Sequence, residues 1–91
     1  MSAVAERFAV RVMVTDVWDQ VFLGVEPTTT VKDLKRRALN EALRQPNPQL
    51  DEYVVKFRGA QVLDESATLA TLGARANAPF IVLPARRQPV R

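Results

Sequence analysis

The residues best suited to acid–base or metal chemistry in this sequence are two pairs of adjacent carboxylates. Asp51 and Glu52 form one pair, and Asp64 and Glu65 form the other. Paired carboxylates can share a proton or bind a metal ion, provided that a pocket brings a substrate or an ion between them. Nothing in the sequence suggests such a pocket, and carboxylates are common in turns. We therefore interpret both pairs as turn residues.

The sequence contains no cysteine and no histidine. This composition excludes disulfides, thiol nucleophiles and metal sites built from thiolates or imidazoles, and it removes the usual general base. Most enzyme classes are excluded with these groups. We predict that the protein is not an enzyme and that it has no catalytic residue, no cofactor and no metal site.

Basic residues are the other chemically notable group, with a net charge of +3 and a pI near 10.0. Acidic and basic residues alternate along the chain, which is more typical of a solvated surface than of an electrostatic footprint. The densest basic cluster could contact nucleic acid or an acidic lipid surface, but few aromatic residues separate its charges and acidic residues interrupt it. We favour a solvated helix face and keep weak nucleic-acid binding as a second alternative. The cluster comprises Lys32, Lys35, Arg36 and Arg37.

Ninety-one residues are enough for one small domain with a single core. No apolar stretch approaches the length that a bilayer requires, and the first residues lack the charge and apolar run of a signal peptide. We expect a cytoplasmic protein without membrane insertion. The predicted organisation is an N-terminal extension at 1–7, a folded domain at 8–84 and a basic C-terminal tail at 85–91.

Hydrophobic periodicity predicts a sheet covered by one helix. Apolar residues alternate with polar ones in several short segments, which indicates strands. Thr30 is the predicted N-cap of an amphipathic helix, whose apolar stripe must lie on the sheet. The opposite face of the sheet is then left in water. The expected elements are strands at 8–14, 20–25, 53–58, 60–63 and 79–84, with Gly59 in the turn between the third and fourth, a helix at 31–44 and a helical turn at 68–73.

Two segments resemble ubiquitin. VEPTTTVKDLK, from Val25 to Lys35, is similar to the part of ubiquitin that ends the second strand and begins the helix. VKFRGAQVLDESATLATLG, together with the final FIVL, resembles its second half in order and spacing, so the likeness covers roughly 8–83. The resemblance implies an α+β fold, a ubiquitin-like β-grasp roll. This fold has a mixed sheet of four to five strands, with the last strand beside the first, and one main helix packed on one face.

The C-terminal residues depart from the conjugated members of this superfamily. Conjugated ubiquitin-like proteins and the related sulfur carriers end in an exposed pair of glycines, whose carboxylate is adenylated by an activating enzyme. Glycine is needed there because the extended tail passes through a narrow channel. The corresponding residues here are Pro84, Ala85, Arg86 and Arg87, and no two glycines are adjacent in the sequence. We therefore expect a ubiquitin-like protein without a diglycine C-terminus. The ten arginines against three lysines, together with the alanine content, are typical of a GC-rich genome, so we expect a bacterial protein.

The exposed sheet face is the predicted binding site. In ubiquitin this face carries an apolar patch centred on an isoleucine, and the matching residue here is Lys56. Trp18, in the first hairpin loop, is a candidate anchor because tryptophan offers a large rigid surface. The alternatives are that the strand residues are merely solvated and that the Trp18 ring folds onto the neighbouring strands. The predicted partner-binding residues are Lys56, Arg58, Ile81, Leu83, Arg11 and Trp18.

These observations predict a non-catalytic ubiquitin-like module for protein–protein interaction, either an adaptor or a small subunit of a larger bacterial assembly. Secretion systems and multicomponent oxygenases contain small proteins of this kind. The partner is expected to have an acidic rim that complements Lys56. A modifier or sulfur-carrier-type protein with an atypical C-terminus remains the alternative. The sequence does not predict the identity of the partner or the oligomeric state.

Overall fold

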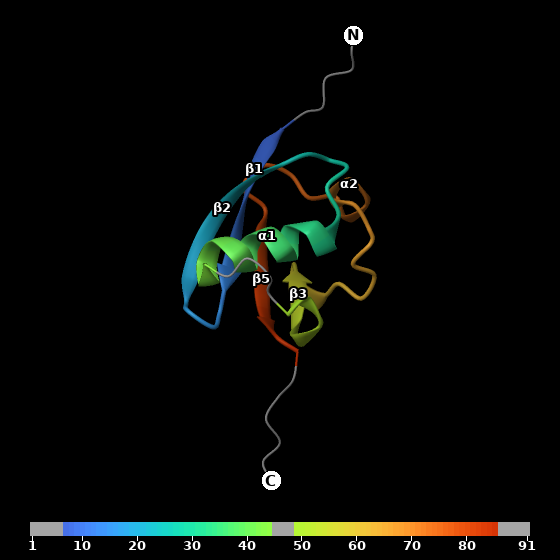
Figure 1. Cartoon of the computed structure of the whole chain (residues 1–91). Helices are drawn as coiled ribbons and strands as arrows, with labels where there is room; N and C mark the ends of the chain where they lie inside the picture. Colours follow the sequence, from blue (N-terminus) through green and yellow to red (C-terminus); the bar gives the residue numbers. More distant parts are fainter. Residues whose placement is uncertain (1–6, 45–48, 86–91) are drawn as a thin grey trace.

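The computed structural model describes residues 7–44 and 49–85. Most of the predicted extension and tail therefore lies outside the described residues. Five strands form one sheet in the order β2-β1-β5-β3-β4 (Figure 1). The elements are β1 (Phe8–Val14), β2 (Asp19–Val25), α1 (Val31–Leu43), a 3-10 helix η1 (Leu50–Glu52), β3 (Tyr53–Phe57), β4 (Ala60–Gln61), α2 (Leu69–Leu72) and β5 (Pro79–Pro84).

The sheet is mixed, as predicted. β1 and β2 form an antiparallel hairpin, whereas β5 runs parallel to β1 and antiparallel to β3. The last strand therefore lies beside the first in the middle of the sheet. α1 lies across one face of this sheet in Figure 1, and its contacts extend from β2 to β3. The α+β architecture with one main helix on one face is confirmed.

Side-chain caps set the starts of both helices. Thr30 precedes α1, and its Oγ1 accepts a hydrogen bond from the backbone N–H of Asp33 at 3.1 Å. Thr68 caps the single turn of α2 in the same way by accepting from the N–H of Thr71. These bonds satisfy N–H groups that have no partner within the helix. In the described part of the chain, no helix is long and apolar enough to cross a membrane.

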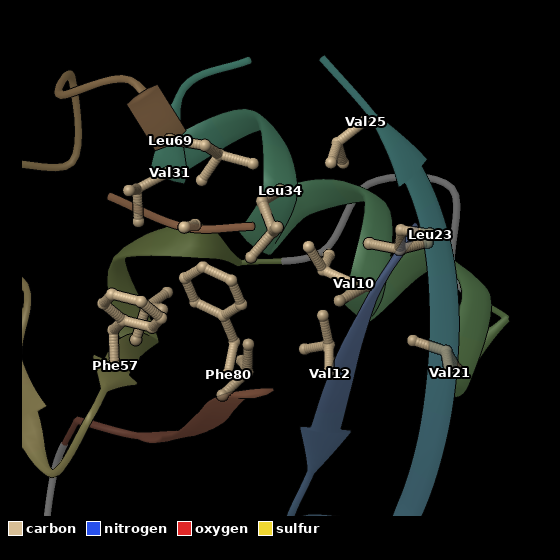
Figure 2. Close-up of a cluster of buried hydrophobic side chains, with 14 of the residues drawn as sticks. Val10, Val12, Val21, Leu23, Val25, Val31, Leu34, Phe57, Leu69 and Phe80 are labelled. Carbon is tan, nitrogen blue, oxygen red and sulfur yellow. The ribbon is translucent and has the colours of Figure 1, made fainter. Parts of the chain in front are cut away.

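The core lies between α1 and the inner face of the sheet. Side chains from β1 and β2 meet the apolar stripe of the helix on one side, and Phe57 of β3 stacks on Phe80 of β5 on the other (Figure 2). The two ring centroids are 4.7 Å apart and the rings are inclined by 19°. The fully buried side chains include Val10, Val12, Val14, Val25, Val31, Leu34, Leu39, Val55, Leu69, Phe80 and Val82.

Lys35 departs from the predicted solvated helix face. Its side chain is only 3% exposed, and its Nζ lies 2.6 Å from Oε1 of Glu65. The same nitrogen donates hydrogen bonds to the backbone oxygens of Leu50 at 2.8 Å and Tyr53 at 2.9 Å. The prediction of a solvated Lys35 is wrong because three acceptors from distant segments converge on the ammonium group. This residue joins α1 to η1, to β3 and to the loop before α2.

The β3–β4 connection is tighter than the sequence suggested. β3 ends at Phe57, and β4 has two residues instead of the predicted four. Arg58 and Gly59 both adopt a left-handed conformation, with φ of 58° and 84°. Two consecutive positive φ angles are typical of the type I′ turn in a two-residue hairpin. Arg58 therefore belongs to a turn and does not continue the alternation of β3.

Candidate protein-binding face

The face of the sheet opposite α1 carries the candidate site. Strand register places its side chains in rows, because cross-strand partners point to the same side. Met13 of β1 is paired with Ile81 of β5, and Ile81 is paired in turn with Lys56 of β3. Leu83 of β5 is paired with Val54 of β3 in the next row. Four of these five side chains are apolar, although they lie on the face that no helix covers.

Phe22 extends this surface to the edge of the sheet. It lies on β2 opposite Arg11 of β1, one row from Met13, and its side chain is 60% exposed. Ile81, at the centre of the surface, is 41% exposed. A continuous apolar surface thus runs diagonally across four strands. We call it the outer apolar band, and its members are Met13, Phe22, Val54, Ile81 and Leu83.

Two cations flank the outer apolar band. Arg11 lies on β1 beside Phe22, and its Nε donates a hydrogen bond to the backbone oxygen of Asn77 at 3.2 Å. This bond restrains the guanidinium group near the sheet. Lys56 lies on the other side, between Ile81 and Gln61 of β4. The two charges are thus separated by apolar side chains, which suits a partner whose acidic groups border an apolar centre.

Four of the six predicted binding residues lie together on this face, namely Arg11, Lys56, Ile81 and Leu83. Arg58 does not join them. Its guanidinium carbon lies 4.9 Å from the centroid of the Phe57 ring, which belongs to the buried face. This is a cation–π contact at the β3–β4 turn, away from the outer apolar band.

Sequence reasoning missed Met13, Phe22 and Val54 as members of the site. The alternation within each strand already separated them from the core residues, so their outward direction was available from the sequence. What the alternation could not show is that strands distant in the sequence bring them side by side. The pairings β1 with β5 and β5 with β3 supply that information.

Trp18 lies in the turn between β1 and β2, and its side chain is 77% exposed. The alternative in which the ring folds onto neighbouring strands is therefore wrong. Its backbone φ is 50°, a left-handed conformation that is rare for a bulky residue, and its N–H donates to the oxygen of Thr15 at 3.2 Å. Strained residues with exposed side chains occur often at binding sites. The neighbouring Val17 is also exposed.

A tyrosine holds this turn in place. The hydroxyl of Tyr53, at the start of β3, donates a hydrogen bond to Oδ2 of Asp16 in the turn. This bond, together with partial burial and the negative charges of Asp16 and Glu52, raises the pKa of Tyr53 to about 12. The neutral hydroxyl is favoured because ionisation would break the bond and place two negative charges together. The interaction links the Trp18 turn to the other half of the sheet.

The carboxylate pairs have structural contacts. Asp64 accepts hydrogen bonds from the N–H and the hydroxyl of Ser66, which lower the pKa of Asp64, and Glu65 is paired with Lys35. Asp51 and Glu52 form part of η1. Across residues 7–44 and 49–85, no group of carboxylates is arranged to bind a metal ion. The turn interpretation agrees with the contacts of Asp64 and Glu65, whereas Asp51 and Glu52 lie in a short 3-10 helix.

The helix cations offer little free charge for nucleic acid. Lys35 is buried, and Arg36 and Arg37 both pair with Asp33 of the same helix. Arg37 also donates to the backbone oxygen of Gly24 at 2.7 Å. These contacts leave Lys32 as the exposed member of the cluster without such an interaction among the described residues. The geometry favours the outer apolar band as the site.

Comparisons with solved structures identify the fold. A ubiquitin from Caldiarchaeum subterraneum superposes with a TM-score of 0.73 and 15% identity, over 92% of this chain and 100% of that one. The ubiquitin-like domain of an Arabidopsis thaliana protein gives a TM-score of 0.73 and 18% identity, over 99% of this chain and 89% of that one. Neither a scan against protein-family models nor a search of curated proteins finds a significant match.

The chain therefore has a ubiquitin-like β-grasp fold. At these identities the likeness shows the fold, and a shared fold does not transfer a function. The function must therefore be inferred from the side chains on the outer face of the sheet.

Proposed function

We propose that this domain is a non-catalytic module that binds one protein partner through the outer face of its sheet, as an adaptor or a small subunit of a larger bacterial assembly in the cytoplasm. The observation that carries the proposal is the outer apolar band, a continuous run of apolar side chains on the face opposite α1. Single exposed apolar residues are ordinary, whereas a contiguous exposed patch is a mark of an interaction site.

The flanking charges define the chemistry of the partner. Arg11 and Lys56 lie on either side of the apolar surface, so a partner needs an apolar centre with carboxylates at its borders. The resemblance to ubiquitin matches Lys56 with the central isoleucine of ubiquitin's apolar patch. Burying that ammonium group in an interface without a carboxylate partner costs on the order of several kcal/mol. Partners that recognise ubiquitin through the isoleucine should therefore bind this domain poorly.

Trp18 extends the proposed surface beyond the sheet. Its ring is exposed at the end of the β1–β2 hairpin, at the same end of the sheet as Leu83, because the N–H of Thr15 donates to the oxygen of Val82 at 3.1 Å. A partner that covers the outer apolar band could also receive this ring in a pocket. Buried tryptophans are frequent hot spots at interfaces.

The test is recovery of the protein with its partner from the cells that make it, followed by affinity measurements on variants. A double variant, Lys56→Glu with Leu83→Ala, should weaken binding by at least roughly tenfold, since it reverses a charge and removes apolar contact area. Lys32→Glu is the matched control because it makes the same charge change on the exposed surface of α1. Unchanged affinity in the double variant would show that the proposed face is wrong.

A modifier or carrier with an atypical C-terminus has the same fold and makes a different prediction. In that case the chain would be joined covalently to another molecule. The mass of the protein from its native cells, measured under denaturing and under gentle conditions, separates the two proposals. A mass increment that survives denaturation supports the modifier. Association seen only under gentle conditions supports the binding module.

A further inference from the structure

The edge of the sheet at β4 carries backbone groups that bond to no other residue in the part of the chain that the structure describes. β4 pairs with β3 through Lys56 with Gln61 and Phe57 with Ala60, and the N–H of Val62 donates to the oxygen of Val55 at 2.8 Å. Because hydrogen-bonded and non-hydrogen-bonded pairs alternate, the bonds to β3 come from Ala60 and Val62. The N–H and C=O of Gln61 therefore point away from β3, into solvent.

At the opposite edge of the sheet, one backbone carbonyl is occupied by a side chain. β2 forms that edge, and the guanidinium of Arg37 donates to its Gly24 oxygen at 2.7 Å. A side chain that occupies an edge carbonyl prevents another strand from pairing there. Among the described residues, no comparable side-chain bond reaches the backbone of Gln61.

One basic and one acidic residue flank β4, so the edges of two copies have complementary charges. Arg58 lies three residues before Gln61, and Asp64 lies three residues after it; both are exposed. The two bonds from Ser66 both reach Oδ1 of Asp64, and Oδ2 accepts no hydrogen bond from any residue within 7–44 and 49–85. An antiparallel pair of β4 strands centred on Gln61 brings the β3–β4 turn of one copy, with Arg58, toward the residues that follow β4 in the other copy, with Asp64. This arrangement occurs twice because of the twofold symmetry.

Apolar surface accompanies these charges. Leu63 is 84% exposed, although it is a large aliphatic residue. In the same pairing it comes near the turn residue Gly59 of the other copy, where a Cβ would meet no atom within 4 Å, so the space above Gly59 is open. A hollow of about 360 Å³ adjoins this edge and is lined in part by Phe57, Val62 and Leu72. Leu63 and the hollow supply apolar area that a second copy would cover.

We propose that β4 is the interface of a symmetric homodimer, in which two copies pair antiparallel about Gln61 and Arg58 of each copy binds Asp64 of the other. The interface is small, so we expect a weak dimer that forms only at high protein concentration. The β4 edge lies outside the outer apolar band. The dimer can therefore be tested independently of the proposed protein-binding function.

The first test measures self-association by sedimentation of the full chain up to roughly 1 mM. The mass should rise with concentration from 10.2 kDa toward that of a dimer. Arg58→Asp and Asp64→Arg each place like charges together twice, and each should raise the dissociation constant by roughly tenfold. The double variant restores opposite charges and should return to within about threefold of the original value. A chain that stays monomeric, or a double variant without rescue, overturns the proposal.

The second test removes the outward backbone donor. Gln61→Pro deletes an N–H that β3 does not use, so the hairpin can form while the dimer loses its central bond. Gln61→Ala is the matched control, since it shortens the same side chain and keeps the N–H. Circular dichroism verifies that both variants fold. Monomeric Gln61→Pro beside dimeric Gln61→Ala supports the proposal, whereas dimerisation by both variants places the interface elsewhere and refutes it.

Discussion

Replacing Lys35 with methionine tests whether this buried ammonium group holds three segments of the fold together. Methionine has a similar length and keeps the apolar stem in place, while it removes the charge and all donors. The substitution leaves the Glu65 carboxylate and the backbone oxygens of Leu50 and Tyr53 without their present donor. The experiment therefore isolates the polar contacts from the packing of the side chain.

The expected loss follows from the burial of each partner. A hydrogen bond to a charged group contributes about 1.5 to 3 kcal/mol, and loss of one partner of a fully buried ion pair costs about 3 to 5 kcal/mol. Lys35 is 3% exposed, but Glu65 is 23% exposed, so water can replace part of what the carboxylate loses. We expect Lys35→Met to lower the free energy of unfolding by about 2 to 3 kcal/mol. For a domain of this size, that corresponds to a fall in Tm of roughly 10 to 20 °C.

Urea denaturation followed by circular dichroism measures the effect, with two companion variants. Lys32→Met makes the same substitution at an exposed position of the same helix and should change the stability by less than about 0.5 kcal/mol. Glu65→Gln keeps an oxygen acceptor while it removes the charge, so it should lower stability by about 1 kcal/mol. The order Lys35→Met, Glu65→Gln, Lys32→Met, from largest loss to smallest, is the specific expectation.

A neutral or stabilising Lys35→Met would refute this reasoning. Buried ion pairs in some proteins can be replaced by apolar residues without loss, because the cost of desolvating the charges cancels their attraction. Equal losses in Lys35→Met and Lys32→Met would be a second contradiction, since the effect would then belong to helix propensity or net charge.

Three further predictions follow from single contacts. The pKa of Tyr53, the single tyrosine, is raised to about 12 from 10.0, so the bond to Asp16 contributes fully to stability below pH 10 and its contribution is lost as the pH rises through 12. The absorbance of tyrosinate should show a titration midpoint near 12, and Asp16→Asn should shift that midpoint toward 10. Thr30→Ala removes the N-cap bond of α1 and should lower stability by about 1 kcal/mol in urea denaturation, and an unchanged value would mean that the cap contributes nothing. Asparagine tolerates the left-handed conformation of residue 18 better than tryptophan does, so Trp18→Asn should raise the free energy of unfolding by roughly 0.5 to 1 kcal/mol while it weakens partner binding. A loss of stability would show that the ring packs on the domain in solution.

The elements of the fold were largely predictable because their signals are local. Alternating apolar residues marked β1, β2, β3 and β5, and the threonine before α1 marked its N-terminus. The errors were also local. Two consecutive left-handed residues ended β3 at Phe57, and the sequence signal of Gly59 did not reveal that Arg58 adopts the same conformation. η1 was missed because its three residues are too few for a periodic pattern.

The site was predictable in part. Lys56, Ile81, Leu83 and Arg11 were expected on one face, and strand register places them there. Arg58 was expected beside Lys56 because alternation was extended past the end of β3. The role of Lys35 was hidden for a different reason: a lysine on an amphipathic helix is ordinarily solvated, and its acceptors come from residues that follow it by 15, 18 and 30 positions.

The sequence by itself determined that the chain contains no cysteine and no histidine, where its strands and main helix begin, and which side of each strand is apolar. These properties depend on residue type and on short-range periodicity, so they can be read without knowledge of the fold. Tertiary structure decided what no local pattern contains. The pairing of β5 with β1 and β3 assembled the outer apolar band, the β3–β4 turn separated Arg58 from it, and three converging acceptors buried Lys35. Each depends on contacts between residues far apart in the chain, and packing and strand register establish such contacts only when the whole domain folds.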